Sequence, residues 1–157
     1  MTETSEAKSQ TKGSVIRSGF VIGISENRFL GRGWHEREVH GLGGIPFRAT
    51  QERAEFRLEI PAGPSRLKLL VFAHVALLGG LYEGEVSLDG RTVGAISIET
   101  ESWALRTFVL PPSPTERVGE FLLVNKRTLV PGRVIPDCRD YRVLGCGVGA
   151  AIIEGVA

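Results

Sequence analysis

Residues 53–60 read Arg-Ala-Glu-Phe-Arg-Leu-Glu-Ile, so charged and apolar side chains alternate at every position. Because successive side chains of a strand point to opposite faces, this period of two gives one apolar face and one charged face. A strand that is buried on one face and wet on the other is typical of antiparallel sheets. The stretch therefore predicts an all-β protein in which Phe56 points into the core.

Other segments show similar patterns and turn signals. Asp89 and Gly90 lie between two alternating runs, which is the strongest short signal for a hairpin. Eight or so antiparallel strands in 157 residues predict an antiparallel two-sheet β-sandwich of jelly-roll type, with a closed barrel as the alternative. The strands are expected at 14–24, near 34–40, and at 53–60, 66–76, 82–88, 91–98, 103–110, 118–124 and 142–154. The segments 25–52 and 125–141 are expected to be long loops, which are often functional.

The length fits one domain, expected over residues 14–157, preceded by a polar and disordered tail over 1–13. The net charge is +1 with acids and bases interspersed, which argues against a nucleic-acid partner. No apolar run approaches the length of a membrane span, so no membrane partner is expected. Cys138 and Cys146 are expected to be ordinary intracellular thiols, with a disulfide between them as the alternative. With no apolar leader at the N-terminus, they indicate a cytoplasmic protein.

Candidates for catalysis are few. If residues 34–40 form a strand, Glu36, Glu38 and His40 share a face and could ligate a metal ion. Solvated charges beside a loop explain the same residues more simply. Neither cysteine lies in a recognisable nucleophile motif, and the glycines around Cys146 lack the lysine of a phosphate-binding loop. No catalytic residue and no cofactor is therefore predicted. An enzyme that uses a metal ion on the face of Glu36, Glu38 and His40 is an alternative to the two non-catalytic interpretations below.

Trp34 offers a binding chemistry instead. Sugar sites stack the apolar face of a sugar on an aromatic ring and bond its hydroxyls to charged side chains. Trp34 with Phe29, Glu38 and Arg48 would supply both parts. The alternative is that Trp34 covers an open end of the sandwich, and the sequence leaves both interpretations open.

A sparse pattern of motifs gives a resemblance. The following occur in this order: Gly33 and Trp34, Glu38, 48–50, the hairpin at 89–90, Trp103, and finally Asp140-Tyr-Arg-Val-Leu-Gly145. The pattern resembles β-sandwich accessory modules beside glycosyltransferase and methyltransferase domains in bacterial glycan-assembly proteins. The resemblance spans residues 30–154 and implies a non-catalytic jelly roll that binds glycan or a neighbouring domain. Ala49 stands where those modules carry Trp, which removes one aromatic that could stack on a sugar.

The matched charges have a second interpretation. Glu38, Arg48, Asp140 and Arg142 could form a paired cluster that closes one end of the sandwich, because partly buried charges must be paired. The candidate ligand-binding residues are thus Trp34, Glu38, Arg48, Asp140 and Arg142. The sequence favours a non-catalytic, carbohydrate-binding module whose partner is a glycan or another protein domain. The alternative is a structural or protein-interaction domain that forms a homo-oligomer through a sheet face.

Overall fold

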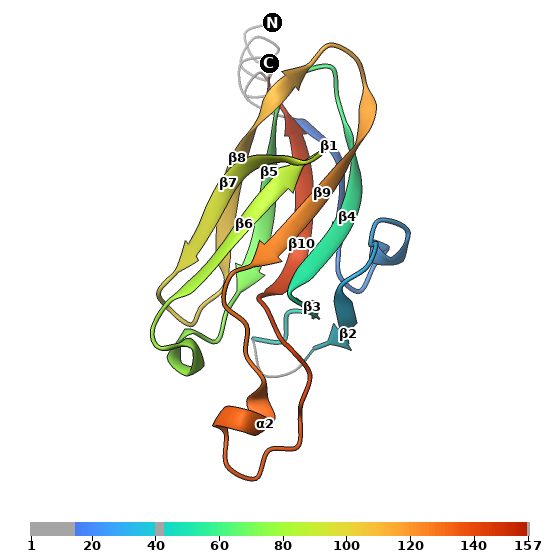
Figure 1. Cartoon of the computed structure of the whole chain (residues 1–157). Helices are drawn as coiled ribbons and strands as arrows, with labels where there is room; N and C mark the ends of the chain where they lie inside the picture. Colours follow the sequence, from blue (N-terminus) through green and yellow to red (C-terminus); the bar gives the residue numbers. More distant parts are fainter. Residues whose placement is uncertain (1–14, 40–42, 157) are drawn as a thin grey trace, which may run out of the picture.

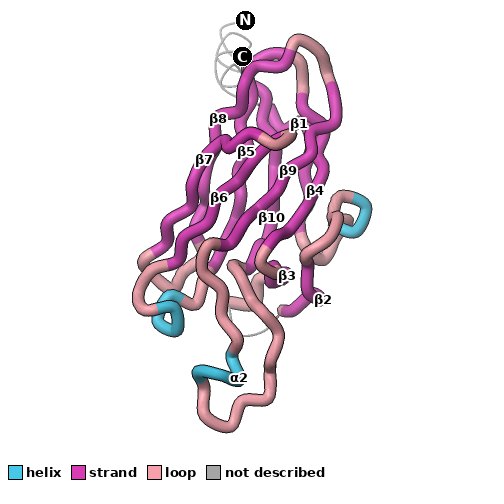
Figure 2. The backbone as a smooth tube through the Cα atoms, in the orientation of Figure 1, coloured by secondary structure: helices cyan, strands magenta, loops and turns pink. Residues whose placement is uncertain are grey.

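The computed structural model describes residues 15–39 and 43–156, which form two packed antiparallel sheets (Figures 1 and 2). This is the predicted β-sandwich, and the strands do not close into a barrel. The predicted tail at 1–13 and His40 lie outside the described residues. None of the described helices is long and apolar enough to cross a membrane.

The larger sheet has six strands. Their order is β2-β3-β10-β5-β8, and β1 pairs with β10 beside β3. These strands are β1 (Val15–Val21), β2 (Trp34–Glu38), β3 (Phe47–Thr50), β5 (Gly63–Phe72), β8 (Ala104–Ser113) and β10 (Gly147–Gly155). The smaller sheet has the order β4-β9-β6-β7, with β4 (Arg53–Ile60), β6 (Tyr82–Leu88), β7 (Arg91–Ile98) and β9 (Arg117–Asn125).

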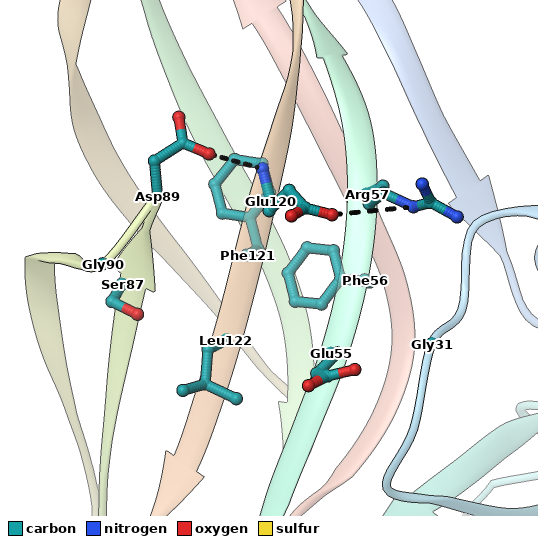
Figure 3. Close-up of a pocket in the computed structure, with 10 residues that line it drawn as sticks. All are labelled: Gly31, Glu55, Phe56, Arg57, Ser87, Asp89, Gly90, Glu120, Phe121 and Leu122. Atoms are coloured by element: carbon teal, nitrogen blue, oxygen red, sulfur yellow. Dashed lines mark hydrogen bonds and ion pairs between the residues drawn. The ribbon is translucent and has the colours of Figure 1, made fainter.

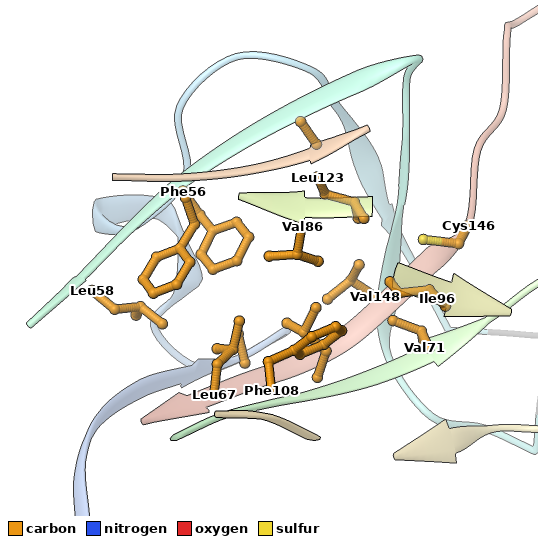
Figure 4. Close-up of a cluster of buried hydrophobic side chains, with 14 of the residues drawn as sticks. Phe56, Leu58, Leu67, Val71, Val86, Ile96, Phe108, Leu123, Cys146 and Val148 are labelled. Atoms are coloured by element: carbon orange, nitrogen blue, oxygen red, sulfur yellow. The ribbon is translucent and has the colours of Figure 1, made fainter. Parts of the chain in front are cut away.

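The core lies between the two sheets (Figure 4). The apolar residues of β4 are all buried and its charged residues are all exposed, as the alternation predicted. Phe56 is 1% exposed and stacks on Phe121 of the neighbouring strand, with ring centroids 5.0 Å apart. The hairpin between β6 and β7 turns at Asp89 and Gly90, where both residues adopt positive φ.

Some boundaries differ from the prediction. The strand β3 lies inside the segment that was predicted to be a loop. The prediction missed this strand because its four residues follow glycines and Pro46 and show too little periodicity. The strand predicted to run to residue 76 ends at Phe72 in β5, and Val75–Leu78 form a 3-10 turn. The last strand begins at Gly147 rather than at 142, because Leu144 leaves the sheet to bridge Leu129.

The segment between β9 and β10, residues 126–146, protrudes from one end of the sandwich and is called the tongue (Figure 1). It contains the single-turn helix α2 (Pro131–Val134). Two backbone hydrogen bonds between Leu129 and Leu144, of 2.8 and 2.7 Å, close its base. A third, from the amide of Gly132 to the carbonyl of Asp140, is 2.7 Å long and ties α2 to the returning chain. The tongue is therefore a folded structure held in place at its base.

Candidate functional site

Three of the five predicted site residues come together where the tongue meets β2. The guanidinium of Arg142 donates two hydrogen bonds to the carboxylate of Asp140, of 2.9 and 2.7 Å. Its other terminal nitrogen lies 3.7 Å from Glu38 Oε2. Glu38, Asp140 and Arg142 are called the rim cluster. The hydrogen bonds from Arg142 lower the pKa of Asp140 to about 2, so this carboxylate is ionised at neutral pH.

Arg48 belongs to a different group. Its Nε lies 3.1 Å from Glu26 Oε2, and its two terminal nitrogens donate to the carbonyl of His35 and to Asn27 Oδ1. The four charges predicted to form one cluster are thus divided: three form the rim cluster, and Arg48 pairs separately with Glu26. The physical reason is the alternation along β3: Phe47 and Ala49 turn toward the rim cluster's side, so Arg48 turns away.

Glu26 is the partner of Arg48 that sequence reasoning missed. It is 3% exposed and lies in the 3-10 turn Glu26–Arg28. Burial alone would raise its pKa, but hydrogen bonds from its own amide, from Gly23 and from Arg48 outweigh burial and lower the pKa. The only sequence signal was one acid among several in a long loop, which does not single it out.

Trp34 packs against the main core. Its ring meets Phe20 and Phe56 edge-on, with centroids 6.3 Å away in both cases. Its indole N–H donates to the carbonyl of Glu55 over 2.7 Å. The ring is half-buried. This geometry agrees with the covering role that the sequence left open, and stacking of a sugar on Trp34 stays a prediction.

A small cavity of about 200 Å³ lies beside the rim cluster and is called the end pocket. Its apolar side chains Phe47, Ala49, Phe72 and Leu129 are buried but lie apart from the main core. They form a satellite cluster of the kind found under long loops. The end pocket is lined by Glu38, Phe47, Ala49, Phe72, His74, Leu77, Leu129, Pro131, Ile135, Asp140, Arg142, Leu144, Gly145 and Gly147.

A buried polar network supports the wall of the end pocket. The amide nitrogen of Asn125 donates to Thr50 Oγ1 (2.8 Å) and to the carbonyl of Gln51 (2.6 Å). Its oxygen accepts hydrogen bonds from the Cys146 amide (3.1 Å) and from the Tyr82 hydroxyl. A side chain on the adjacent Gly145 would collide with Asn125. The network joins both sheets to the base of the tongue, and no sequence motif marks it.

A larger and more open hollow lies on the outer face of the small sheet (Figure 3). This sheet-face hollow has a volume of about 630 Å³ and spans β4, β9 and the turn after β6. Arg57 and Glu120 cross it as an ion pair 3.9 Å long, and both side chains are about two-thirds exposed. Phe56 and Phe121 lie beneath it but are buried in the core. The hollow thus offers exposed charges that pair with each other, without an exposed ring among its lining residues.

Metal binding has limited support. Within residues 15–39 and 43–156, no three His, Cys, Asp or Glu side chains lie close enough to hold a metal ion. The predicted trio of Glu36, Glu38 and His40 is not decided by this, because His40 lies outside that part. Glu38 is instead used in the rim cluster.

Comparisons with known proteins bear on the fold. No family model and no curated protein matches the sequence. Among solved structures, the CBM36-1 domain of a multidomain xylanase from the hindgut metagenome of Trinervitermes trinervoides aligns with a TM-score of 0.52 at 11% identity. That alignment covers 92% of this chain and 98% of the domain. CBM35 from Cellvibrio japonicus Abf62 aligns with a TM-score of 0.52 at 13% identity, over 87% of this chain and 93% of the module.

A third likeness is to part of a much longer enzyme. The 4-O-methyl-α-glucuronidase BtGH115A aligns with a TM-score of 0.52 at 13% identity over 82% of this chain, which spans only 17% of that enzyme's length. Identities this low show the fold alone. The chain has the two-sheet β-sandwich fold of these carbohydrate-binding modules.

Proposed function

We propose that this protein is a non-catalytic carbohydrate-binding module that holds one sugar unit in the end pocket. The observation that carries the proposal is the meeting of an apolar floor with converging charged groups in one partly enclosed cavity. The fold likeness to two carbohydrate-binding modules over nearly their whole length supports it at the level of fold.

The rim cluster has the chemistry that hydroxyl groups require. The carboxylates of Glu38 and Asp140 accept hydrogen bonds, and the guanidinium of Arg142 donates them in fixed directions. Phe47 and Phe72 lie below as an apolar surface for the C–H face of a sugar. Two carboxylates against one guanidinium leave a formal charge of −1, which favours a neutral sugar over an acidic one.

The size and the acidity of the site argue for binding rather than catalysis. A volume of about 200 Å³ is below the roughly 300–1,000 Å³ typical of pockets for drug-sized ligands, so one ring at a time fits. A general acid for glycoside hydrolysis needs a raised pKa, but Arg142 holds the pKa of Asp140 at about 2.

The test is a glycan-array screen followed by calorimetry with the best neutral sugar. Glu38→Gln and Asp140→Asn should each weaken binding about tenfold or more, because each loses a charged acceptor. Arg57→Gln in the sheet-face hollow is the matched control and should bind like the wild type.

Two results would overturn the proposal. One is the absence of any glycan ligand for the folded wild-type protein. The other is loss of binding in the Arg57 variant while the variants of the end pocket keep it. Melting temperatures of all variants separate loss of binding from loss of fold.

A second candidate is self-association through the large sheet. Cross-strand pairs place Val21, Ala150, Leu70 and Leu105 in one row on its outer face. Val21 and Leu105 are 43% and 55% exposed. Leu105→Lys should lower the mass measured by light scattering if this face forms a dimer. An unchanged monomer mass for wild type and variant would remove this candidate.

The proposal also includes the neighbouring domains and the cellular location of the protein. Association with glycosyltransferase or methyltransferase domains in glycan assembly, and a cytoplasmic location, rest on the sequence resemblance and composition. Fractionation of cells that produce the full-length protein would test the location.

A further inference from the structure

The tongue has a hollow of its own, separate from the end pocket. Residues 132–139 and Tyr141 line this tongue hollow, which has a volume of about 530 Å³. Asp140 and Arg142 line the end pocket, whereas Tyr141 between them lines the tongue hollow. The segment 140–142 therefore separates the two hollows, and Ile135 contributes to both.

Tyr141 is unusual among the aromatic residues of this chain. It is 64% exposed, whereas every other Phe, Trp or Tyr in the described part is buried or half-buried. An exposed ring in a concave polar surface is the element that sugar-binding sites need for stacking. Sequence reasoning chose Trp34 for this role, because tryptophan in a glycine-rich loop was the stronger signal.

The ring of Tyr141 is held in position by backbone. A Cβ at Gly132 would lie 2.6 Å from Cε1 of the ring, so the ring rests directly on the glycine. The hydrogen bond from the Gly132 amide to the Asp140 carbonyl fixes the two segments on which this contact depends. A ring that is already positioned loses little conformational entropy when a ligand stacks on it.

Polar side chains line the same hollow as the ring. Among them are Arg133, Asp137 and Arg139. These three side chains are exposed, and within residues 15–39 and 43–156 they form no ion pair or side-chain hydrogen bond. They can bond hydroxyl groups at the edge of a sugar that lies on Tyr141.

We propose that the tongue hollow is a second carbohydrate site, in which a sugar ring of a polysaccharide stacks on Tyr141 while another unit occupies the end pocket. The inference rests on the proposed function. Two sites on one module raise the apparent affinity for a polymer, because the second contact is intramolecular. A short sugar that reaches only one site gains nothing from the other.

The experiment compares a polymer with a short sugar for each variant. Affinity electrophoresis through gels that contain soluble xylan or galactomannan measures polymer binding, and calorimetry with xylose and mannose measures binding of a single unit. Tyr141→Ala should weaken polymer binding about tenfold or more and leave single-unit binding in the end pocket unchanged. Tyr141→Phe keeps the ring and should bind the polymer like the wild type.

Gly132→Ala provides an independent check in which Tyr141 itself is not substituted. The added methyl group displaces Tyr141, so polymer binding should fall as in Tyr141→Ala. In Arg57→Gln, which lies on the sheet face, the polysaccharide should slow migration by the same factor as in the wild type, relative to a gel without polysaccharide. Equal melting temperatures across these variants establish that the fold is retained.

The outcomes separate the two proposals. If Glu38→Gln loses single-unit binding while Tyr141→Ala still binds polymer like the wild type, the second site is wrong and the proposed function stands. If Tyr141→Ala loses single-unit and polymer binding to the same degree, one combined site exists and the inference also fails. If the wild-type protein binds neither probe nor any arrayed glycan, both proposals fail, and the tongue hollow is better explained as a protein-docking surface.

Discussion

Asn125 shows how much can depend on one buried side chain. It is 3% exposed, and its amide group bonds residues from β3 and β6 and also Cys146, the last residue of the tongue. Its hydrogen bonds with Thr50, Tyr82 and Cys146 are buried. A buried donor or acceptor without a partner costs about 1–3 kcal/mol, and networks of this kind fix one arrangement of the segments that they join.

Asn125→Ala should therefore lower the free energy of unfolding by about 2–4 kcal/mol, because Tyr82 and the Cys146 amide lose their acceptor. Urea denaturation at neutral pH measures this loss. Asn27→Ala is the matched control, because Asn27 is exposed and accepts one hydrogen bond from Arg48; its cost should stay below about 1 kcal/mol. Equal losses for both variants would show that the buried network contributes nothing special.

The two cysteines differ sharply in their surroundings. Cys146 is fully buried, and burial raises the pKa of its thiol to about 11. Cys138 lies half-exposed in the tongue hollow. Because the thiolate is the reactive form, a thiol reagent at pH 8 should label the native protein once, at Cys138. Cys138→Ser should abolish labelling until urea is added. Rapid labelling of native Cys138→Ser would show that the base of the tongue opens readily.

At the scale of elements, β4 is an edge strand of the small sheet, and an irregular segment covers the edge that pairs with no other strand. Residues 29–33 run alongside it: the Gly31 and Glu55 amides donate to the carbonyls of Glu55 and Arg32, each over 2.8 Å. The segment is too irregular to count as a strand, but it occupies an edge that would otherwise invite pairing with another chain. Gly33 closes the segment with φ of +96°, and a Cβ there would fall on the Arg53 carbonyl.

Gly33→Ala should detach this segment and destabilise the protein by more than the strain of a positive φ alone, which is about 1–3 kcal/mol. Gly43→Ala isolates that strain, because Gly43 also has a positive φ but open space around it. Hydrogen exchange at the Glu55 and Arg57 amides should accelerate in the Gly33 variant and remain slow in the Gly43 variant. Equal exchange rates in both would mean that the contact with β4 is unimportant.

The sequence predicted regular elements better than it predicted their meeting points. The strict alternation of β4 determined its register and the burial of Phe56, because only one of the two possible registers places the apolar face of the strand in the core. The motif resemblance singled out the two carboxylates and Arg142, and their pairing was expected because charges near a core require partners. The choice of Glu26 for Arg48, the Asn125 network and the exposure of Tyr141 depend on how distant segments approach each other, and local pattern does not encode that.

For the whole molecule, ion pairs connect segments that are far apart in the chain. Glu26 meets Arg48, Glu154 lies 2.9 Å from Arg66 and 3.1 Å from Lys68, and Glu38 lies 3.7 Å from Arg142, which also binds its near neighbour Asp140. Burial alone would raise the pKa of Glu154, but the hydrogen bonds that it accepts from Lys68 and Arg66 lower it. The folded protein thus holds several carboxylates whose pKa values lie below those of the unfolded chain.

This arrangement sets the response to acid. A carboxylate with a lowered folded pKa contributes its stability above the unfolded value, which is 4.5 for Glu26 and 3.8 for Asp140, and loses it as the pH falls toward the folded value. The melting temperature should therefore hold between about pH 5 and 7 and fall progressively toward pH 2. Glu26→Gln should melt lower than the wild type at pH 7 and show a shallower decline in acid. A melting temperature that stays flat from pH 7 to pH 2.5 would contradict this, because it would require that none of these carboxylates takes up a proton more readily on unfolding.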